Sequence, residues 1–80
     1  MNINWLVEDI VFETMLEADV WADSLVNEIY GRNFNGYITT DYKIACAMAF
    51  RLATARELRV FTSEDEPNRY KVWVEFHNQE

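Results

Sequence analysis

One stretch in the middle of the chain restricts the possible folds more than any other. When residues 41–57 are placed on a helical wheel, nearly every direction is apolar. The apolar residues of this stretch are Tyr42, Ile44, Ala45, Cys46, Met48, Ala49, Phe50, Leu52 and Ala53. The remaining strip, which we expect to face solvent, consists of Lys43, Ala47, Arg51 and Thr54. Because a helix that is apolar almost all round is normally buried, the sequence predicts a central helix that begins near Thr40 or Asp41.

The first 31 residues also have a helical pattern. On a wheel of about 100° per residue, one arc of roughly 80° collects a set of apolar positions. These positions are Val7, Val11, Met15, Ala18, Ala22, Leu25 and Ile29. Gly31 is a natural C-terminal stop, and Thr14 followed by Glu17 fits a capping box. The segment is therefore either one helix or two helices that meet near residue 14.

The rest of the chain is expected to form turns and strands. Residues 32–40 are turn-like, because Asn33, Asn35 and Gly36 tolerate left-handed backbone conformations. Further along, Leu58 and Val60 precede a polar segment, residues 62–68, that we interpret as a long loop. The segment after this loop alternates, with Tyr70, Val72, Val74 and Phe76 on one face and Lys71, Trp73, Glu75 and His77 on the other. This alternation predicts an antiparallel β-hairpin.

Together these patterns predict one small α+β domain over residues 1–80. Eighty residues is room for a single domain. We expect helices in the N-terminal two-thirds, residues 1–57, and a C-terminal antiparallel β-hairpin whose Val72, Val74 and Phe76 pack on the helices.

Charge is distributed unevenly along the chain. Fourteen acidic residues against seven basic ones give a formal charge of -7. Residues 1–31 contain no base, and their acids are Glu8, Asp9, Glu13, Glu17, Asp19, Asp23 and Glu28. On one continuous helix these carboxylates would follow one another at about 4.5 Å, close to the roughly 3.4 Å between phosphates of one DNA strand. Such a surface repels nucleic acid and anionic membranes and attracts basic proteins.

The sequence therefore suggests a set of residues for partner binding. The carboxylates of the first block are Glu8, Asp9, Glu13, Glu17, Asp19 and Asp23, with Trp5 and Phe12 as aromatic anchors. Glu64, Asp65 and Glu66 form a second acidic patch. Two other interpretations stay open: the carboxylates are a solvated face, or they pair internally with Arg51, Arg56 and Arg59.

Catalysis and cofactor binding are not expected. The chain has one histidine, His77, and one cysteine, Cys46, whereas zinc sites need three or four ligands. Its two glycines, Gly31 and Gly36, form no phosphate-binding loop. The N-terminus lacks the basic region of a signal peptide, and no apolar run approaches the roughly 20 residues of a membrane span. We expect a cytoplasmic protein without cofactor or metal, with a homodimer as one possible state.

Two functional hypotheses follow. The first is a small inhibitor that occupies the basic, nucleic-acid-binding surface of a partner protein. In size, charge and aromatic content the chain resembles the DNA-mimicking inhibitors that phages use against restriction or CRISPR effectors. The second is a winged-helix-like, nucleic-acid-binding or transcription-regulating module, in which Lys43, Arg51 and Thr54 face a DNA groove.

Overall fold

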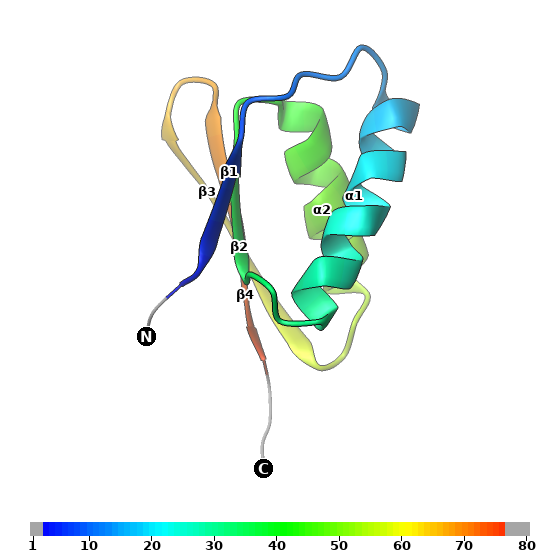
Figure 1. The fold of residues 1–80 in the computed structure, drawn as a ribbon. Helices are drawn as coiled ribbons and strands as arrows, with labels where there is room; N and C mark the ends of the chain where they lie inside the picture. Colours follow the sequence, from blue (N-terminus) through cyan, green and yellow to red (C-terminus); the bar gives the residue numbers. More distant parts are fainter. Residues whose placement is uncertain (1–2, 77–80) are drawn as a thin grey trace.

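The computed structural model describes residues 3–76 and has two layers (Figure 1). One layer is a four-stranded mixed sheet in the order β1-β2-β4-β3, and the other contains both helices, which lie on the same face of the sheet. The strands are β1 (Trp5–Glu8), β2 (Gly36–Thr39), β3 (Leu58–Glu66) and β4 (Arg69–Phe76). The helices are α1 (Met15–Tyr30) and α2 (Tyr42–Ala53). The α+β class and the C-terminal hairpin are confirmed.

The prediction of a largely helical region over residues 1–57 missed two strands, β1 and β2. These two strands pair in parallel, and α1 is the connection between them. The segment 36–39 lies in the middle of the sheet and is fully buried, although its residues had indicated a turn. Pairing with β1 and β4 overrides the local turn preference. Gly36 is required there, because an added Cβ would lie 2.6 Å from the side chains of Ile3 and Trp5.

Helix α1 begins and ends where its capping signals indicate. Its N-cap is Thr14, whose Oγ1 accepts a hydrogen bond from the Glu17 backbone N–H at 3.1 Å. At the other end the N–H of Gly31 donates to the carbonyl of Asn27. The four later positions of the predicted stripe are buried, namely Ala18, Ala22, Leu25 and Ile29. Val7, Val11 and Met15 are exposed. The helix begins only at Met15, so Val7 and Val11 are not part of its stripe.

Helix α2 starts after the N-cap Asp41, as predicted, and ends at Ala53, earlier than expected. The prediction that Ala47 belongs to a solvent-facing strip is wrong, because Ala47 is buried. That side of α2 faces α1: Arg51, from the same strip, reaches two carboxylates of α1. A different side of α2 is bare, with Tyr42 63% and Phe50 76% exposed.

The hairpin is longer and its turn tighter than predicted. Residues 62–66 continue β3 instead of forming a loop, and the turn consists of Pro67 and Asn68, with Asn68 at φ 67°. A bulge separates Glu64 from Glu66. An edge strand tolerates such polar residues because its free edge faces water. Val72 and Val74 are buried in the core and Phe76 packs against it, as expected, whereas His77 lies outside the described residues.

The model does not have the arrangement expected of the winged-helix alternative. A helix-turn-helix unit joins its two helices by a short turn. Here the buried strand β2 lies between α1 and α2. Of the strip of α2 that would have to enter a DNA groove, Arg51 is paired with α1, Lys43 is paired with Asp41, and Thr54 is exposed.

Candidate functional site

Two acidic segments that are far apart in the sequence meet at one end of the sheet. The pairing register places Glu8, Thr39, Tyr70 and Glu64 in one row across the four strands. The loop 9–14 follows Glu8, and the hairpin tip follows Glu64, so both lie at the same end of the molecule (Figure 1). Three strand spacings, roughly 14 Å, separate β1 from β3.

We call this region the acidic end and define it by Asp9, Glu13, Glu17, Glu64, Asp65 and Glu66. All six residues are exposed. Within residues 3–76 only one of these carboxylates forms an ion pair, that of Asp65 with Lys71. The Lys71 ammonium holds the pKa of Asp65 below its ordinary value. The other carboxylates of the acidic end keep their charge uncompensated by a close base of the described chain.

The loop of the acidic end is fixed to the body of the protein. The backbone N–H of Phe12 donates to Asp41 Oδ2 at 2.8 Å, and the Phe12 ring packs on Trp21 at 6.0 Å between centroids. The N–H of Glu13 donates to Glu17 Oε1 at 3.2 Å. The loop therefore presents its carboxylates from a defined backbone.

Asp41 is the buried residue on which this arrangement depends. Its side chain is 2% exposed and also accepts the backbone N–H of Lys43 at 3.0 Å, while the Lys43 ammonium lies 3.0 Å away. Burial disfavours the ionised form, but the hydrogen bonds from Phe12 and Lys43 and the nearby ammonium outweigh burial. The pKa of Asp41 is consequently lowered.

Glu8, a predicted contact residue, is engaged inside the protein. Its Oε1 accepts a hydrogen bond from the Tyr37 hydroxyl at 2.7 Å and another from Trp21 Nε1 at 3.2 Å. Burial and the neighbouring carboxylate raise the pKa of Tyr37 above its ordinary range. Glu8 therefore joins β1 to α1 and β2.

Asp19 and Asp23 share one arginine. Arg51 of α2 binds both oxygens of Asp19 at 2.9 and 3.1 Å, and its Nη1 lies 3.0 Å from Asp23 Oδ1. The hydrogen bond to Asp19 is the main reason that the pKa of Arg51 is raised. The internal-pairing interpretation thus holds for these two residues. It does not extend to Arg59, whose nearest carboxylate is Glu75 at 4.0 Å.

Of the two predicted aromatic anchors, Trp5 is separate from the acidic end, whereas Phe12 lies in its loop with the ring turned inward. Trp5 and Trp73 lie on the sheet face opposite to Leu6, Val72 and Val74, which face the core, and the two rings are edge-on at 5.8 Å between centroids. Phe61 stacks on the other side of Trp73 at 5.6 Å. Phe12 is half-buried against Trp21. Neither anchor is freely available to a partner.

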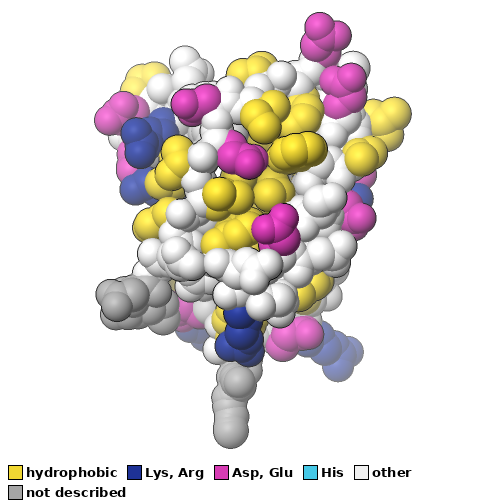
Figure 2. Space-filling model, viewed as in Figure 1, with side chains coloured by type: hydrophobic (Ala, Val, Ile, Leu, Met, Phe, Trp, Pro, Cys, Tyr) yellow, Lys and Arg dark blue, Asp and Glu magenta, His cyan; other side chains and the backbone are white. Residues whose placement is uncertain are grey.

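Other apolar side chains lie beside the acidic residues and were missed in the sequence. Val11 is 67% exposed, and its neighbour Ile10 is exposed as well. Both lie in the loop between Asp9 and Glu13. On the face seen in Figure 2, apolar side chains gather over β1 and α1 with acidic side chains among them. The sequence did contain a signal for this pair. Ile10 and Val11 are two apolar residues inside an acidic segment, and they precede Thr14, the capping residue at which the helix starts.

Comparisons with known proteins give no relative. No family model matches the sequence, and no curated protein and no solved structure matches the chain. Within the part of the chain that the structure describes, no His, Cys, Asp and Glu side chains gather in groups of three or more that could hold a metal ion. No helix in that part has both the length and the apolar character needed to cross a bilayer.

Proposed function

We propose that this protein is a non-catalytic binding protein, an inhibitor whose acidic end occupies a basic, nucleic-acid-binding surface of a partner protein. The observation that supports this proposal is the meeting of two acidic segments at one end of the sheet, where Asp65 alone forms an ion pair with a base of the described chain. Uncompensated like charges destabilise a compact protein by mutual repulsion. Binding a basic surface would relieve this repulsion.

The composition of the acidic end fits a protein partner. Protein interfaces combine apolar side chains at their centre with a polar rim, and here Ile10 and Val11 lie between Asp9 and Glu13. Because Asp41 fixes the loop in the free protein, less conformational entropy is lost when the loop binds.

The arrangement of the acidic end limits which basic surfaces of a partner it could bind. A long DNA-like row of carboxylates does not form, because Glu8 is engaged internally and Asp19 and Asp23 are both paired with Arg51. What remains is a set of carboxylates at one end of the molecule, in the loop 9–14, at the start of α1 and at the hairpin tip, with β1 and β3 roughly 14 Å apart. We therefore propose a short basic cleft as the target, of the size that holds a few phosphates.

A pull-down from the lysate of the native host tests this proposal. The bait is the wild-type protein beside two variants with equal charge change, Asp9→Lys/Glu66→Lys at the acidic end and Glu28→Lys/Glu57→Lys elsewhere. All four substituted residues are exposed. We expect a basic protein that is retained at low salt and released at high salt, retained by the second variant and lost by the first.

A second experiment, with duplex DNA, distinguishes the proposal from direct nucleic-acid binding. Fluorescence polarisation with labelled duplex DNA at low salt should show no binding by the wild-type protein, because its charge is negative. Tight duplex binding, or retention of the same proteins by both variants, would refute the proposal.

A further inference from the structure

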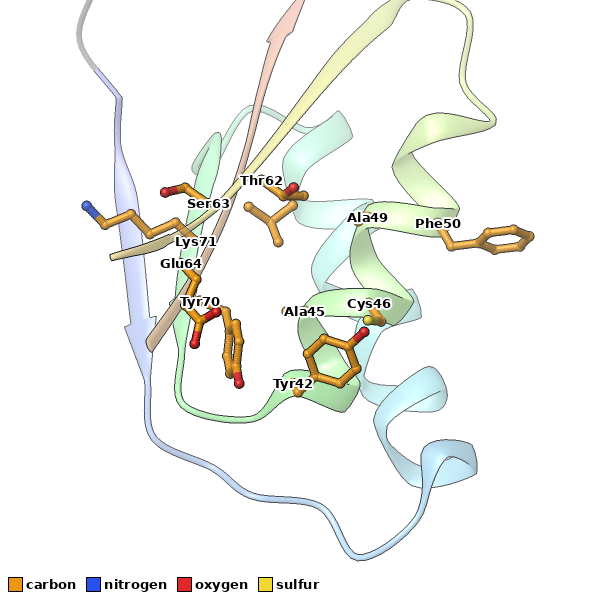
Figure 3. A pocket seen from close by; sticks show the side chains of 11 residues that line it. Tyr42, Ala45, Cys46, Ala49, Phe50, Thr62, Ser63, Glu64, Tyr70 and Lys71 are labelled. Atoms are coloured by element: carbon orange, nitrogen blue, oxygen red, sulfur yellow. The ribbon is translucent and has the colours of Figure 1, made fainter. Parts of the chain in front are cut away.

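One flank of α2 is apolar and uncovered. This flank, which we call the bare flank, consists of Tyr42, Cys46, Ala49 and Phe50, and it borders a groove of about 690 Å³ toward β3 and β4 (Figure 3). Phe50 is the most exposed of the large apolar residues, at 76%. Since helices with apolar residues on nearly all sides are normally covered, the bare flank needs a neighbour that residues 3–76 do not supply.

We propose that a second copy of this chain covers the bare flank, with the two α2 helices antiparallel across a twofold axis. Cys46 lies midway between Tyr42 and Phe50, about 6 Å along the helix from each. An axis near Cys46 therefore places each Tyr42 opposite the partner's Phe50. Cys46 and Ala49 are small, so the two helix axes can approach to roughly 8–10 Å, the distance typical of packed helices.

The charges around the groove favour a second copy over another partner. Glu64 lines the groove at the Tyr42 end, where Tyr42 packs edge-on against Tyr70 at 5.5 Å (Figure 3). Arg56 is exposed in the turn that follows α2, at the opposite end of the helix. An antiparallel pair brings each Glu64 toward the partner's Arg56. An isologous interface must be complementary to itself in this way.

A dimer also explains how so short a chain tolerates an uncovered flank. A chain of this length buries only about 60% of its unfolded surface, and self-association supplies additional burial. In the proposed dimer the two acidic ends point in opposite directions. The dimer is inferred from the bare flank and not from the proposed function, and Glu64 is the one residue that belongs both to the acidic end and to the proposed dimer contact.

The oligomeric state tests the inference directly. Sedimentation equilibrium over about a hundredfold range of concentration should show a monomer–dimer equilibrium. Phe50→Asp should raise the dissociation constant about a hundredfold, as loss of a central aromatic contact does. The matched control is Leu16→Asp on α1, since Leu16 is similarly exposed, at 73%, but lies off the bare flank. A monomer at every concentration, or equal loss with both variants, would overturn the inference.

Cross-linking tests the antiparallel arrangement without any substitution. Cys46 is the only cysteine, so a covalent dimer can form only through this residue. Copper–phenanthroline takes two electrons and two protons from a pair of thiols, and we expect a rapid disulfide-linked dimer that Phe50→Asp slows about tenfold or more. Glu64→Arg should weaken the dimer, and Glu64→Arg/Arg56→Glu should restore it. A dimer whose Cys46 residues do not cross-link faster than those of Phe50→Asp would contradict this arrangement.

Discussion

Two regions of this protein carry carboxylates that differ in what surrounds them. Glu8, Asp19, Asp23 and Asp41 have donors or a base within hydrogen-bond distance. In the acidic end, only Asp65 has an ion pair within residues 3–76. The first region links elements of the fold, and the second is available to a partner. Counting acids along the chain therefore overstates the charge that a partner meets.

The largest difference between the two regions should appear in stability. Replacing Asp41 with alanine removes the N-cap of α2 and leaves the N–H of Phe12 without an acceptor. We expect a loss of about 3 kcal/mol in the free energy of unfolding. Urea denaturation measures this loss, and Asp9→Ala is the matched control with a change within about 0.5 kcal/mol. Equal losses of unfolding free energy in the two variants would show that the two regions do not differ in their contribution to stability.

The hydrogen bond between Tyr37 and Glu8 should contribute less. Tyr37→Phe removes a hydroxyl that donates to Glu8 at 2.7 Å in a largely buried setting. The expected loss is about 1 kcal/mol. Tyr30→Phe is the control, because Tyr30 is exposed. If Tyr37→Phe left the free energy of unfolding unchanged, Glu8 would belong with the solvated carboxylates instead.

The two regions should also differ in how they make the stability of the protein depend on pH. The pKa of Asp41 is lowered from its ordinary value of 3.8, so its stabilising contribution is present above that value and is lost as the pH falls through the lower folded pKa. Asp41→Asn should therefore flatten the decline of stability below about pH 4. Urea midpoints measured across this range for both proteins test the sign. A steeper decline in the variant would contradict it.

The smallest expected effect is on the acidic end itself. Glu13→Gln/Glu66→Gln should leave the unfolding free energy within about 0.5 kcal/mol of wild type. Any change should be a gain at low salt, because repulsion among carboxylates is relieved. Thermal melts at low and high salt check this prediction. A clear loss of stability at both would show that these side chains support the fold.

Much of the fold could be predicted from local signals. Thr14, Gly31 and Asp41 mark helix ends by chemistry that acts within a few residues, and the alternation of β4 identifies its buried face. The strands β1 and β2 could not be found this way, because each has four residues and is defined by its neighbours in the sheet. The turn residues Pro67 and Asn68 fall inside the predicted loop, but the loop was predicted too long because polar residues of β3 were interpreted as part of it.

The candidate site was predictable in composition but not in arrangement. The acids of the loop and of the hairpin tip were both identified, yet only the sheet register brings them to one end. The pairing of Arg51 with Asp19 and Asp23 joins residues on two different helices. No spacing rule along the chain predicts such a contact, because the packing of α1 against α2 determines it.

The affinity of the partner recovered from the host tests the central claim most directly. Isothermal titration of that protein with wild type, Asp9→Lys/Glu66→Lys and Glu28→Lys/Glu57→Lys at low and high salt gives the comparison. We predict that the first variant weakens binding by about a hundredfold or more at low salt and loses most of the salt dependence, while the second binds like wild type. Equal affinities for all three proteins would show that the acidic end is not the binding surface.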